Sequence, residues 1–367
     1  MLAAMPTEPT IILGLESSCD ETSAALVADG RRVLSNVVAS QVELHERFGG
    51  VVPEVASRAH IEAINPVLAE ALAEAAVAPE QIAGIAVTSE PGLIGSLLVA
   101  VMAAKTLAWA WGKPLAAINH VHAHAYSPAL DAEPIEYPAV ALVISGGHTA
   151  LYHCLSPVEV TTLGQTIDDA AGEAFDKVAS ILNLGYPGGP VVDRAANGGN
   201  AKAVSLPVTL LEGQSLDFSF SGLKTAVLYH VNGVPNAQLS PQAIAAKGPG
   251  YAKGAANLSP QEMADIAASF QSVVAEVLAI KLRRAVAHCF AAGPAVRSIV
   301  VGGGVAANSA IRARLLAVAE KLRCTLRLAP LKFCTDNAAM IAGLGYHHLA
   351  AGRRAGLDLE ATPTMRP

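Results

Sequence analysis

The sequence predicts a two-lobed α/β protein, and its length, a repeated strand pattern and a βαβ unit support this prediction. A chain of 367 residues exceeds the size at which one hydrophobic core stops growing, so two lobes of roughly 150 residues or more are expected. Hydrophobic residues make up 52% and charged residues 15% of the chain. This balance is typical of folded domains and excludes a disordered protein.

A short pattern occurs twice along the chain. Residues 11–27 read as an apolar strand, a polar turn and a second apolar strand. Residues 139–154 repeat this order, again with small and hydroxyl residues at the bend. The repeat indicates a duplicated architecture.

Residues 82–118 are predicted to form a βαβ unit, with strands at 82–88 and 115–118 and a helix at 96–111. Ser259, Pro260 and Glu262 form a strong start signal for a helix, because Ser and Glu can satisfy free amides reciprocally and Pro suits the first turn. Longer helical patterns fill the second half, at residues 167–182, 260–291, 310–322 and 337–350.

The predicted domain organisation has a tail, two lobes and an insertion. Residues 1–10 are expected to be a flexible tail, residues 11–136 with 337–360 the N-terminal lobe, and residues 137–336 the C-terminal lobe. Residues 231–258 are rich in Gly, Ala, Asn and Pro without sustained periodicity, so we expect an exposed insertion there.

The charge and the cysteine content limit which partners and which cellular compartment are expected. The net charge of -6 does not indicate a basic nucleic-acid-binding surface. A nucleic acid would therefore have to bind to a local basic patch or to another subunit. Five cysteines without a CxxC motif favour reduced thiols in a cytoplasmic protein. Residues 93–104, the longest apolar stretch, are too short to span a bilayer, so no membrane association is expected.

His120, His122 and His124 follow the predicted strand at 115–118. If the segment is helical, His120 and His124 share one face, at a spacing that lets two imidazoles bind one metal ion. A polar surface segment with partly satisfied histidines is the alternative. No Glu lies between the two histidines, so the general base of an HExxH peptidase is missing.

Asp336 lies at the start of the predicted helix 337–350. Such a residue most often caps the helix by accepting a hydrogen bond from a free amide. From the local pattern alone, capping is therefore favoured, and the alternative is that Asp336 completes a site of two histidines and one carboxylate, which suits divalent iron or zinc. The sequence pattern leaves both interpretations open.

Three Gly-rich turns, at residues 145–148, 186–190 and 302–308, favour a nucleotide-type ligand. Bare glycine lets a ligand approach backbone amides, and a following helix presents its positive end to phosphate. Neither a GxGxxG motif nor a P-loop is present. Asp176 comes too late in its predicted helix to be a first-turn acid, so it is a candidate acceptor for ribose hydroxyls.

Ten motifs, in order from about residue 11 to 345, together resemble the TsaD family, the bacterial tRNA threonylcarbamoyladenosine transferases once labelled glycoproteases. They are GLESSCDET (14–22), GGVVPEVASRAH (49–60), PGLIGSLLV (91–99), HxxxH (120–124), SGGHT (145–149), DDAAGEAFDK (168–177), YPGGP (186–190), DFSFSGLKT (217–225), GGGVAAN (302–308) and FCTDNAAM (333–340).

The resemblance implies an actin and Hsp70-like ATPase fold, with duplicated ribonuclease H-like domains around a central ligand cleft. It implies metal ligation by His120, His124 and Asp336, with Fe²⁺ as the first expectation and Zn²⁺ as the alternative. It also implies that threonylcarbamoyl-AMP is bound by Val143, Ile144, Ser145, Gly146, Gly147, Asp176, Gly189, Asp193 and Asn308.

The implied reaction moves the threonylcarbamoyl group to N6 of adenosine 37 in tRNAs that read codons beginning with A, and releases AMP. Asp20 and Glu21 are candidate general bases, and turn-forming polar residues are the alternative interpretation. The implied partners are tRNA, a paralogous TsaB-like subunit and a TsaE-like P-loop ATPase, with a TsaC-type enzyme supplying the adenylate upstream. The helix near residues 60–76 is a candidate dimer surface.

Two other functions fit the same fold. A small-molecule kinase would share the Gly-rich turns but would need a catalytic Asp near the second turn, and a noncatalytic partner would bind nucleotide without needing the metal ligands. Members of the fold that hydrolyse ATP usually have Asp in both strand turns, where this chain has Glu16 and Ser145. We therefore expect the chain to keep a nucleotide-binding site but not to hydrolyse ATP in the ordinary way.

Overall fold

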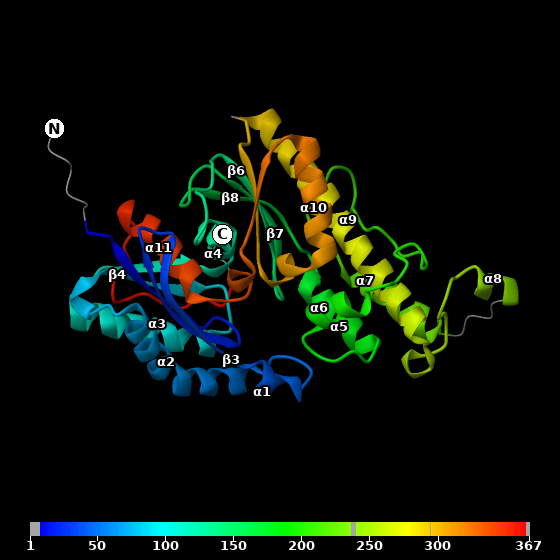
Figure 1. Cartoon of the computed structure of the whole chain (residues 1–367), viewed down its shortest axis with the longest axis horizontal. Coiled ribbons are helices and arrows are strands. Elements are labelled where there is room, and N and C mark those ends of the chain that lie inside the picture. Colours follow the sequence, from blue (N-terminus) through cyan, green and yellow to red (C-terminus); the bar gives the residue numbers. More distant parts are fainter. Residues whose placement is uncertain (1–7, 236–239, 294, 365–367) are drawn as a thin grey trace. The chain divides into compact units, whose positions relative to one another are not determined.

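The structure is a computed structural model that describes residues 8–235, 240–293 and 295–364. The chain divides into two compact units (Figure 1). Unit 1 comprises Met1–His45, Val51–Pro134 and Thr335–Pro367, and unit 2 comprises Glu46–Gly50 and Ile135–Cys334. Asp336 therefore belongs to unit 1. Residues 1–7 of the expected tail lie outside the described residues.

Unit 1 contains a five-stranded sheet in the order β3-β2-β1-β4-β5. Its strands are β1 (Ile11–Glu16), β2 (Glu21–Ala28), β3 (Arg32–Ser40), β4 (Ile82–Glu90) and β5 (Leu115–Asn119). The first three strands are antiparallel neighbours, whereas β1, β4 and β5 run parallel. The carboxyl ends of β1 and β5 consequently lie at the same edge of the sheet.

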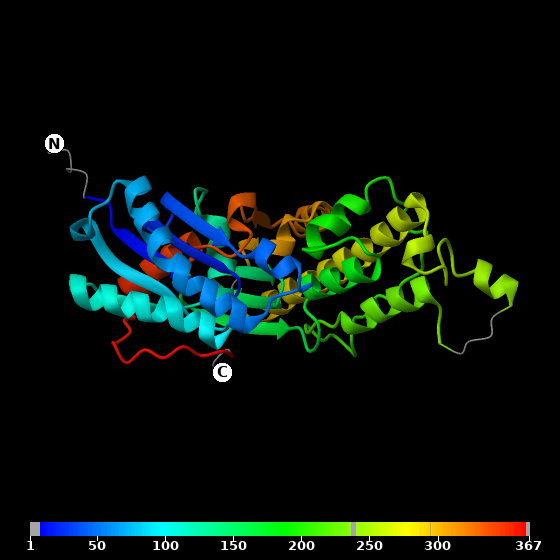
Figure 2. The same cartoon turned by 90° about the horizontal axis from the view of Figure 1, so that it is seen from below.

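Helices cover both faces of the unit 1 sheet. The long helices α2 (Pro53–Ala75) and α3 (Ile94–Trp111) pack side by side on one face (Figure 2), where they share a core with Leu13 and Leu15. On the other face, Gly345 of α11 (Ala338–Ala350) lies against Ile12 and Ala86. Because both faces are buried, the central strands are almost entirely apolar. The short helices are α1 (Val42–Glu46) and α4 (His120–Tyr126).

The C-terminal segment of unit 1 runs beside α3 (Figure 2). The amide of Ala355 donates to the carbonyl of Leu115, and the ammonium of Lys105 donates to the carbonyl of Leu359. Farther on, Thr362 bonds to the end of β4 through the carbonyl of Ser89. The segment is thus held along its length by backbone hydrogen bonds.

Unit 2 contains a second five-stranded sheet with the same connectivity, in the order β10-β9-β6-β7-β8. Strand β6 pairs antiparallel with β7 and parallel with β9, as β1 pairs with β2 and β4. The strands are β6 (Ala139–Ile144), β7 (Thr149–Cys154), β8 (Val160–Gln165), β9 (Ser298–Gly302) and β10 (Thr325–Leu328). The duplication expected from the repeated pattern is confirmed.

The core of unit 2 is built around α9 (Pro260–Ala292), whose Phe270 packs edge-on against Phe175 with ring centroids 5.0 Å apart. The predicted start of α9 is confirmed, since Ser259 and Glu262 form a reciprocal capping box. The other helices are α5 (Ala171–Ile181), α6 (Gly188–Ala195), α7 (Ser221–Asn232), α8 (Pro241–Ala245) and α10 (Ser309–Leu322). Short 3-10 turns lie at Pro79–Gln81, Ser127–Ala129, Ala255–Asn257, Gly304–Ala307 and Leu331–Phe333.

The described part of residues 231–258 is joined to the end of α7 by backbone hydrogen bonds. The amides of Ala252 and Gly254 donate to the carbonyls of His230 and Val231.

By length and composition alone, α3 and α9 are long and apolar enough to cross a bilayer. This is weak evidence for a membrane segment, because most of the apolar window of α9 is buried in the core of unit 2.

Candidate metal centre

Helix α4 begins where β5 ends, and Asn119 starts it. The Asn119 side chain accepts hydrogen bonds from the amides of Val121 and His122, at 2.9 and 3.1 Å. This satisfies two of the free amides at the start of the helix. His120 thereby becomes the first helical residue, and His124 follows one turn later on the same side.

The start of α11 is capped without Asp336. The Asn337 side chain accepts from the amide of Met340, while Ser23 and Asn36 accept from the amides of Ala338 and Ala339. The capping interpretation of Asp336 is therefore wrong. Its carboxylate is left to face α4.

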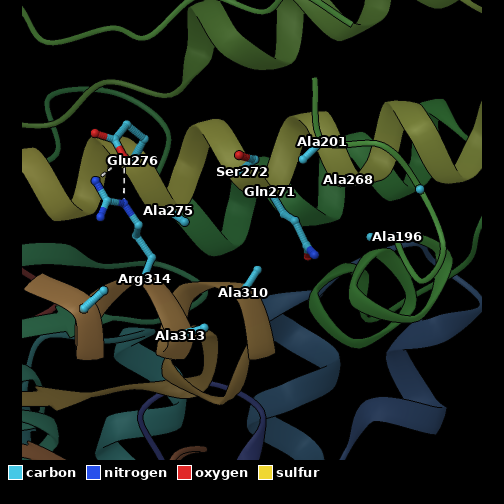
Figure 3. Close-up of a pocket in the computed structure, with 12 residues that line it drawn as sticks. Ala196, Ala201, Ala268, Gln271, Ser272, Ala275, Glu276, Ala310, Ala313 and Arg314 are labelled. Atoms are coloured by element: carbon cyan, nitrogen blue, oxygen red, sulfur yellow. Dashed lines mark hydrogen bonds and ion pairs between the residues drawn. The ribbon is translucent and has the colours of Figure 1, made fainter. Parts of the chain in front are cut away.

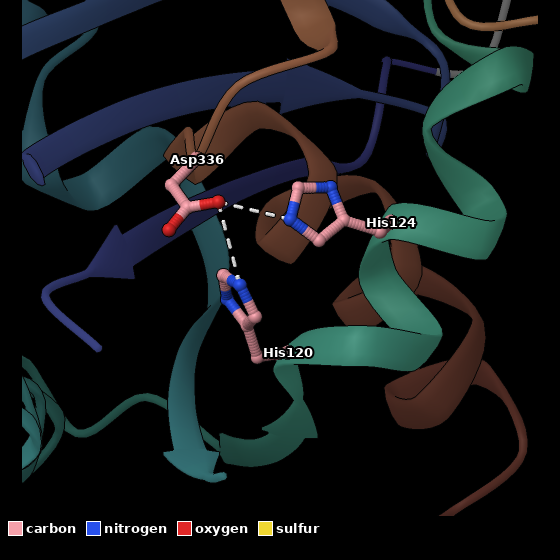
Figure 4. Close-up of side chains that lie close together, drawn as sticks. All are labelled: His120, His124 and Asp336. Atoms are coloured by element: carbon pink, nitrogen blue, oxygen red, sulfur yellow. Dashed lines mark hydrogen bonds and ion pairs between the residues drawn. The ribbon is translucent and has the colours of Figure 1, made fainter. Parts of the chain in front are cut away.

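The three predicted ligands converge within unit 1 (Figure 4). Nε2 of His124 lies 2.9 Å and Nε2 of His120 lies 3.4 Å from the same oxygen, Oδ1 of Asp336. One ligand atom from each residue lies within 4.8 Å of the others. In the described part of the chain, no other group of three His, Cys, Asp or Glu side chains meets this condition. Two imidazole nitrogens and one carboxylate suit Fe²⁺ or Zn²⁺ and leave coordination positions open.

The site is closed to solvent on the histidine side. The side chain of His124 is 0% exposed and that of His120 is 5% exposed, whereas 19% of the Asp336 side chain is exposed. Access is therefore from the side of Asp336. Nδ1 of His120 faces a second carboxylate, that of Glu16, at 2.9 Å.

The protonation of the three residues is coupled. Burial alone would lower the pKa of His120, but the carboxylates of Asp336 and Glu16 outweigh burial and raise this pKa well above its usual value. The pKa of His124 is lowered, chiefly by burial. Burial would raise the pKa of Asp336, yet the two histidines hold it well below its usual value. The site thus favours an ionised carboxylate.

Asp20 and Glu21, the candidate bases, lie in the turn between β1 and β2 and at the start of β2. The Ser40 hydroxyl donates to the Glu21 carboxylate at 3.4 Å. Burial, followed by the negative charges of Asp336 and Asp20, raises the pKa of Glu21 well above its usual value. A carboxylate with such a pKa can accept a proton near neutral pH.

A buried histidine that the sequence interpretation missed supports this turn. His60 of α2 is completely buried, with Nδ1 2.7 Å from the Thr22 hydroxyl and Nε2 3.0 Å from the carbonyl of Cys19. The Gln41 amide also donates to the carbonyl of Asp20. The only sequence signal for this role was the position of His60 in the GGVVPEVASRAH motif.

In unit 2, the first group of predicted ligand-binding residues forms the end of β6 and the turn after it. The side chains of Val143 and Ile144 are buried, so only their backbone can meet a ligand. The turn is closed by a hydrogen bond from the Ser145 amide to the carbonyl of His148. Gly146 and Gly147 at its tip are exposed.

The remaining predicted residues lie at a helix start or bond to one. Asp176 accepts from the amide of Gly188 at 2.7 Å, where α6 begins. Asp193 accepts from the Ser309 hydroxyl at 2.8 Å, and Asn308 caps α10. Gly189 follows in the first turn of α6, and a Cβ added there would meet no atom within 4 Å.

A cavity of about 520 Å³ in unit 2 is lined by residues of α9 and α10 and by Ala196 at the end of α6 (Figure 3). Its polar lining includes Gln271, whose Oε1 accepts from the Asn308 side chain at 3.1 Å, and the ion pair of Glu276 with Arg314. Most of the other lining residues are alanine or glycine, at positions 196, 199, 201, 268, 275, 310, 313 and 317. Its size falls within the range of small-molecule sites.

The motif DFSFSGLKT joins the start of α7 to the loop before α5. The carboxylate of Asp168 accepts from the hydroxyls of Ser219 and Ser221, both at 2.6 Å, and from the amide of Phe220 at 2.9 Å. These bonds hold the pKa of Asp168 below its usual value against the opposing effect of burial. The motif is used here as a structural fastening.

The two equivalent sheets and the group of two histidines and one carboxylate define a class. The protein is a member of the actin and Hsp70-like ATPase fold with a candidate metal centre. HypF of T. kodakarensis aligns with 95% of this chain and 49% of its own, with a TM-score of 0.60 at 16% identity, and full-length HypF in a phosphate- and nucleotide-bound form gives 0.56 at 11%. At such identities the likeness shows the fold alone.

Sequence comparison identifies the family. Residues 32–343 match the family described as TsaD: tRNA N6-adenosine threonylcarbamoyltransferase. A protein of that name from Symbiobacterium thermophilum is 50% identical over 97% of this chain and 96% of its own length. Another, from Anaeromyxobacter dehalogenans, is 47% identical over 97% of this chain and 99% of its own. The chain belongs to the TsaD family, and the resemblance inferred from its motifs is confirmed.

Proposed function

We propose that this protein transfers a threonylcarbamoyl group to N6 of an adenosine in tRNA. The observation that carries the proposal is the convergence of His120, His124 and Asp336 in a chain that matches full-length relatives bearing this name. The finer proposal is that the donor is threonylcarbamoyl-AMP and the acceptor is adenosine 37 of tRNAs that read codons beginning with A. AMP is then the second product.

His120, His124 and Asp336 would hold one divalent metal ion, Fe²⁺ first and Zn²⁺ as the alternative. Such an ion, when bound, supplies Lewis-acid stabilisation for a carbonyl or phosphoryl oxygen. The chain's own contribution is to keep Nε2 of both imidazoles and an ionised carboxylate aimed at one point, with the histidines shielded from water.

Residues of unit 2 would hold the adenylate donor. The exposed amides of Gly146 and Gly147 suit the phosphate, because bare glycine lets it approach the backbone closely. The cavity beside Asn308, lined mainly by small side chains, suits a flat adenine ring. The carboxylate of Asp193, which bonds to Ser309 beside Asn308, could accept hydrogen bonds from ribose hydroxyls. The carboxylate of Asp176 could do the same. Val143, Ile144 and Gly189 complete the proposed set through their backbone.

Glu21 is the better of the two candidate bases. The amine lone pair of adenosine is delocalised into the ring, so transfer needs positioning and a proton acceptor. Glu21 is placed in a turn held by the buried His60, and its raised pKa suits that task. Asp20 precedes Glu21 in the chain, and its negative charge helps to raise the pKa of Glu21.

We further propose that the protein works in the cytoplasm without a membrane, with a TsaB-like subunit and a TsaE-like P-loop ATPase, downstream of a TsaC-type enzyme. An apolar stripe on α3 supports the TsaB-like partner: Ile94, Leu98, Met102 and Trp109 are 46%, 45%, 54% and 74% exposed. Ile61 of the neighbouring α2 is 64% exposed. This surface extends the expected dimer surface near residues 60–76 onto α3.

No observation favours the kinase or the noncatalytic partner. The turn Ser145–His148 offers no Asp to a kinase. Glu16 is completely buried and bonded to Thr88 and His120, so it is unavailable to a nucleotide.

Reconstitution tests the proposed function. The protein is incubated with the three partner proteins, threonine, bicarbonate, ATP and unmodified tRNA, and the RNA is digested for nucleoside mass analysis. We expect threonylcarbamoyladenosine only when this protein is present. Absence of the modified nucleoside, with the partners shown to be active, contradicts the proposal.

A further inference from the structure

Glu16, the last residue of β1, carries a carboxylate that is completely shielded from solvent and has no role in the proposed reaction. Its Oε1 accepts from the amide of Ser18 at 2.5 Å, and its Oε2 accepts from the hydroxyl of Thr88 at 2.6 Å. The same Oε2 lies 2.9 Å from Nδ1 of His120. A buried carboxylate with this many polar neighbours is a specific arrangement, because burying it unpaired would be costly.

These bonds determine which nitrogen of His120 carries hydrogen. The Ser18 amide can only donate, so the carboxylate acts as an acceptor on that side. Nδ1 of His120 then donates to Oε2, and the lone pair of the neutral ring lies on Nε2. Nε2 is the atom that faces Asp336.

The second histidine lacks such a support. Nδ1 of His124 is buried and has no hydrogen-bond partner among the described residues. The two histidines therefore differ: the Nδ1 side of His124 is held by packing alone among the described residues, whereas a carboxylate at Nδ1 fixes both the orientation and the tautomer of His120. Partners of this kind typically change metal affinity 10- to 100-fold when they are removed.

We propose that Glu16 is a positioning residue of the metal site, which holds His120 in the tautomer that presents Nε2 to the metal, and that Thr88 fixes Glu16 for this task. The proposal rests on the metal-dependent function proposed above and deepens it. Glu16 stands where ATP-hydrolysing members of the fold usually have an Asp, and here its carboxylate bonds to a candidate metal ligand.

Glu16→Gln tests this role in a side chain of the same shape. The introduced amide offers one acceptor oxygen. If that oxygen meets the Ser18 amide, the NH₂ group faces Nδ1 of His120 and forces hydrogen onto Nε2; in the opposite orientation, the NH₂ group faces the Ser18 amide donor. We expect Zn²⁺ to bind the purified variant about 10- to 100-fold more weakly in competition with a chromophoric chelator.

Ser17→Ala is the matched control, because Ser17 lies in the same buried turn but bonds to Ser96 and Ala100 of α3. We expect the control to bind Zn²⁺ with wild-type affinity. With Co²⁺ as the probe, Glu16→Gln should change the visible spectrum of the bound ion, which a loss of stability alone would not do. Unchanged Zn²⁺ affinity and an unchanged Co²⁺ spectrum in folded Glu16→Gln would overturn the proposal.

Two further variants separate the alternatives. Thr88→Val keeps the shape of the side chain but removes one hydrogen-bond donor to Glu16. Zn²⁺ affinity should therefore fall by a smaller factor than in Glu16→Gln. This variant serves as the test if Glu16→Gln fails to fold. The Ser18 hydroxyl lies 3.2 Å from Nδ1 of His120. A loss of affinity in Ser18→Ala, with none in Glu16→Gln or Thr88→Val, would assign the role to Ser18 and overturn the proposal.

These measurements use the protein and the metal alone, so they are independent of tRNA. Zn²⁺ binding that depends on Glu16, without any threonylcarbamoyladenosine in the reconstitution, would contradict the proposed function and support the role of Glu16. If the modified nucleoside forms but Zn²⁺ affinity does not change in Glu16→Gln, the proposed function is supported and the role of Glu16 is contradicted.

Discussion

The three histidines of α4 have different surroundings although they lie within five residues. His120 and His124 face Asp336, whereas burial lowers the pKa of His122 to about 4 without help from a carboxylate. His122 is half-buried and lies apart from the Asp336 carboxylate that the other two histidines face. Only two of the three imidazoles are available to a metal ion.

His120→Ala and His124→Ala should each abolish metal binding, because either change leaves two ligands of three. His122→Ala is the matched control on the same helix and should retain the metal. Metal content after reloading with Zn²⁺ and gel filtration measures the effect. Loss of metal from His122→Ala alone would contradict the assignment of ligands.

Glu21→Gln should lower transfer about 10²- to 10⁴-fold, the usual contribution of a general base. Metal content should not change, because Glu21 is not a ligand. The readout is the initial rate of threonylcarbamoyladenosine formation in the reconstituted system. A rate close to wild type would show that Glu21 does not accept the proton.

Lys281 gives a residue-scale prediction for stability. This side chain is completely buried, and its ammonium donates to the carbonyls of Leu210 and Ser215. Burial, assisted by the charge of Arg284, lowers its pKa from 10.5 to about 8. Between these two values the unfolded chain binds more protons than the folded protein, so the free energy of unfolding rises with pH.

Urea unfolding at pH 7.5 and pH 9.5 measures this effect. The wild type should gain stability across the interval relative to Lys281→Met, which cannot titrate, whereas the exposed Lys202→Met should follow the wild type. Parallel pH dependence in all three proteins would show that Lys281 keeps an ordinary pKa.

The family resemblance grouped His120, His124 and Asp336, which the structure brings together, but local sequence patterns could not decide how Asp336 is used. A capping role was excluded only when the amides of α11 were seen to bond to Asn337, Ser23 and Asn36. Ser23 and Asn36 lie more than 300 residues away in the chain. No local pattern reports such partners, and the same holds for Glu16 and His120.

At the scale of elements, the approach of α11 to β1 determines where Asp336 lies. Gly14 packs directly on the first turn of α11, where a Cβ would clash with the carbonyl of Ala338 and the backbone of Ala342. The absence of a side chain at Gly14 therefore places the Asp336 carboxylate close to α4.

Gly14→Ala should lower the free energy of unfolding by about 1–3 kcal/mol, as overpacking does, and should weaken Zn²⁺ binding by displacing α11. Gly222→Ala is the control, because a Cβ there meets no atom within 4 Å. Chemical denaturation and Zn²⁺ competition give the two readouts. Wild-type Zn²⁺ affinity in Gly14→Ala would show that the site tolerates a shift of α11.

Strands buried on both faces were predictable, whereas the edge strands β3 and β8 were not. The apolar runs of β1, β4 and β6 and the capping box of α9 are readable in the sequence. The edge strands β3 and β8 contain polar and partly exposed residues, so their apolar periodicity is weak.

At the scale of the whole molecule, the duplication explains what the two units offer. Both contain a sheet of the same connectivity with a turn after its first strand. In unit 1 this turn carries Asp20 beside Glu16, and in unit 2 it carries Gly146 and Gly147. One scaffold thus carries the candidate metal centre in unit 1 and the proposed phosphate-binding turn in unit 2.

The central claim is that transfer to tRNA depends on metal held by His120, His124 and Asp336. To test it, metal is removed from the protein with a chelator, and the chelator is then removed. Threonylcarbamoyladenosine formed from threonylcarbamoyl-AMP and tRNA is measured before and after Fe²⁺ or Zn²⁺ is added. The TsaB-like and TsaE-like partners are present throughout. The account predicts loss of transfer on stripping, recovery on reloading, and no recovery in Asp336→Ala. Full transfer by the stripped protein would contradict it.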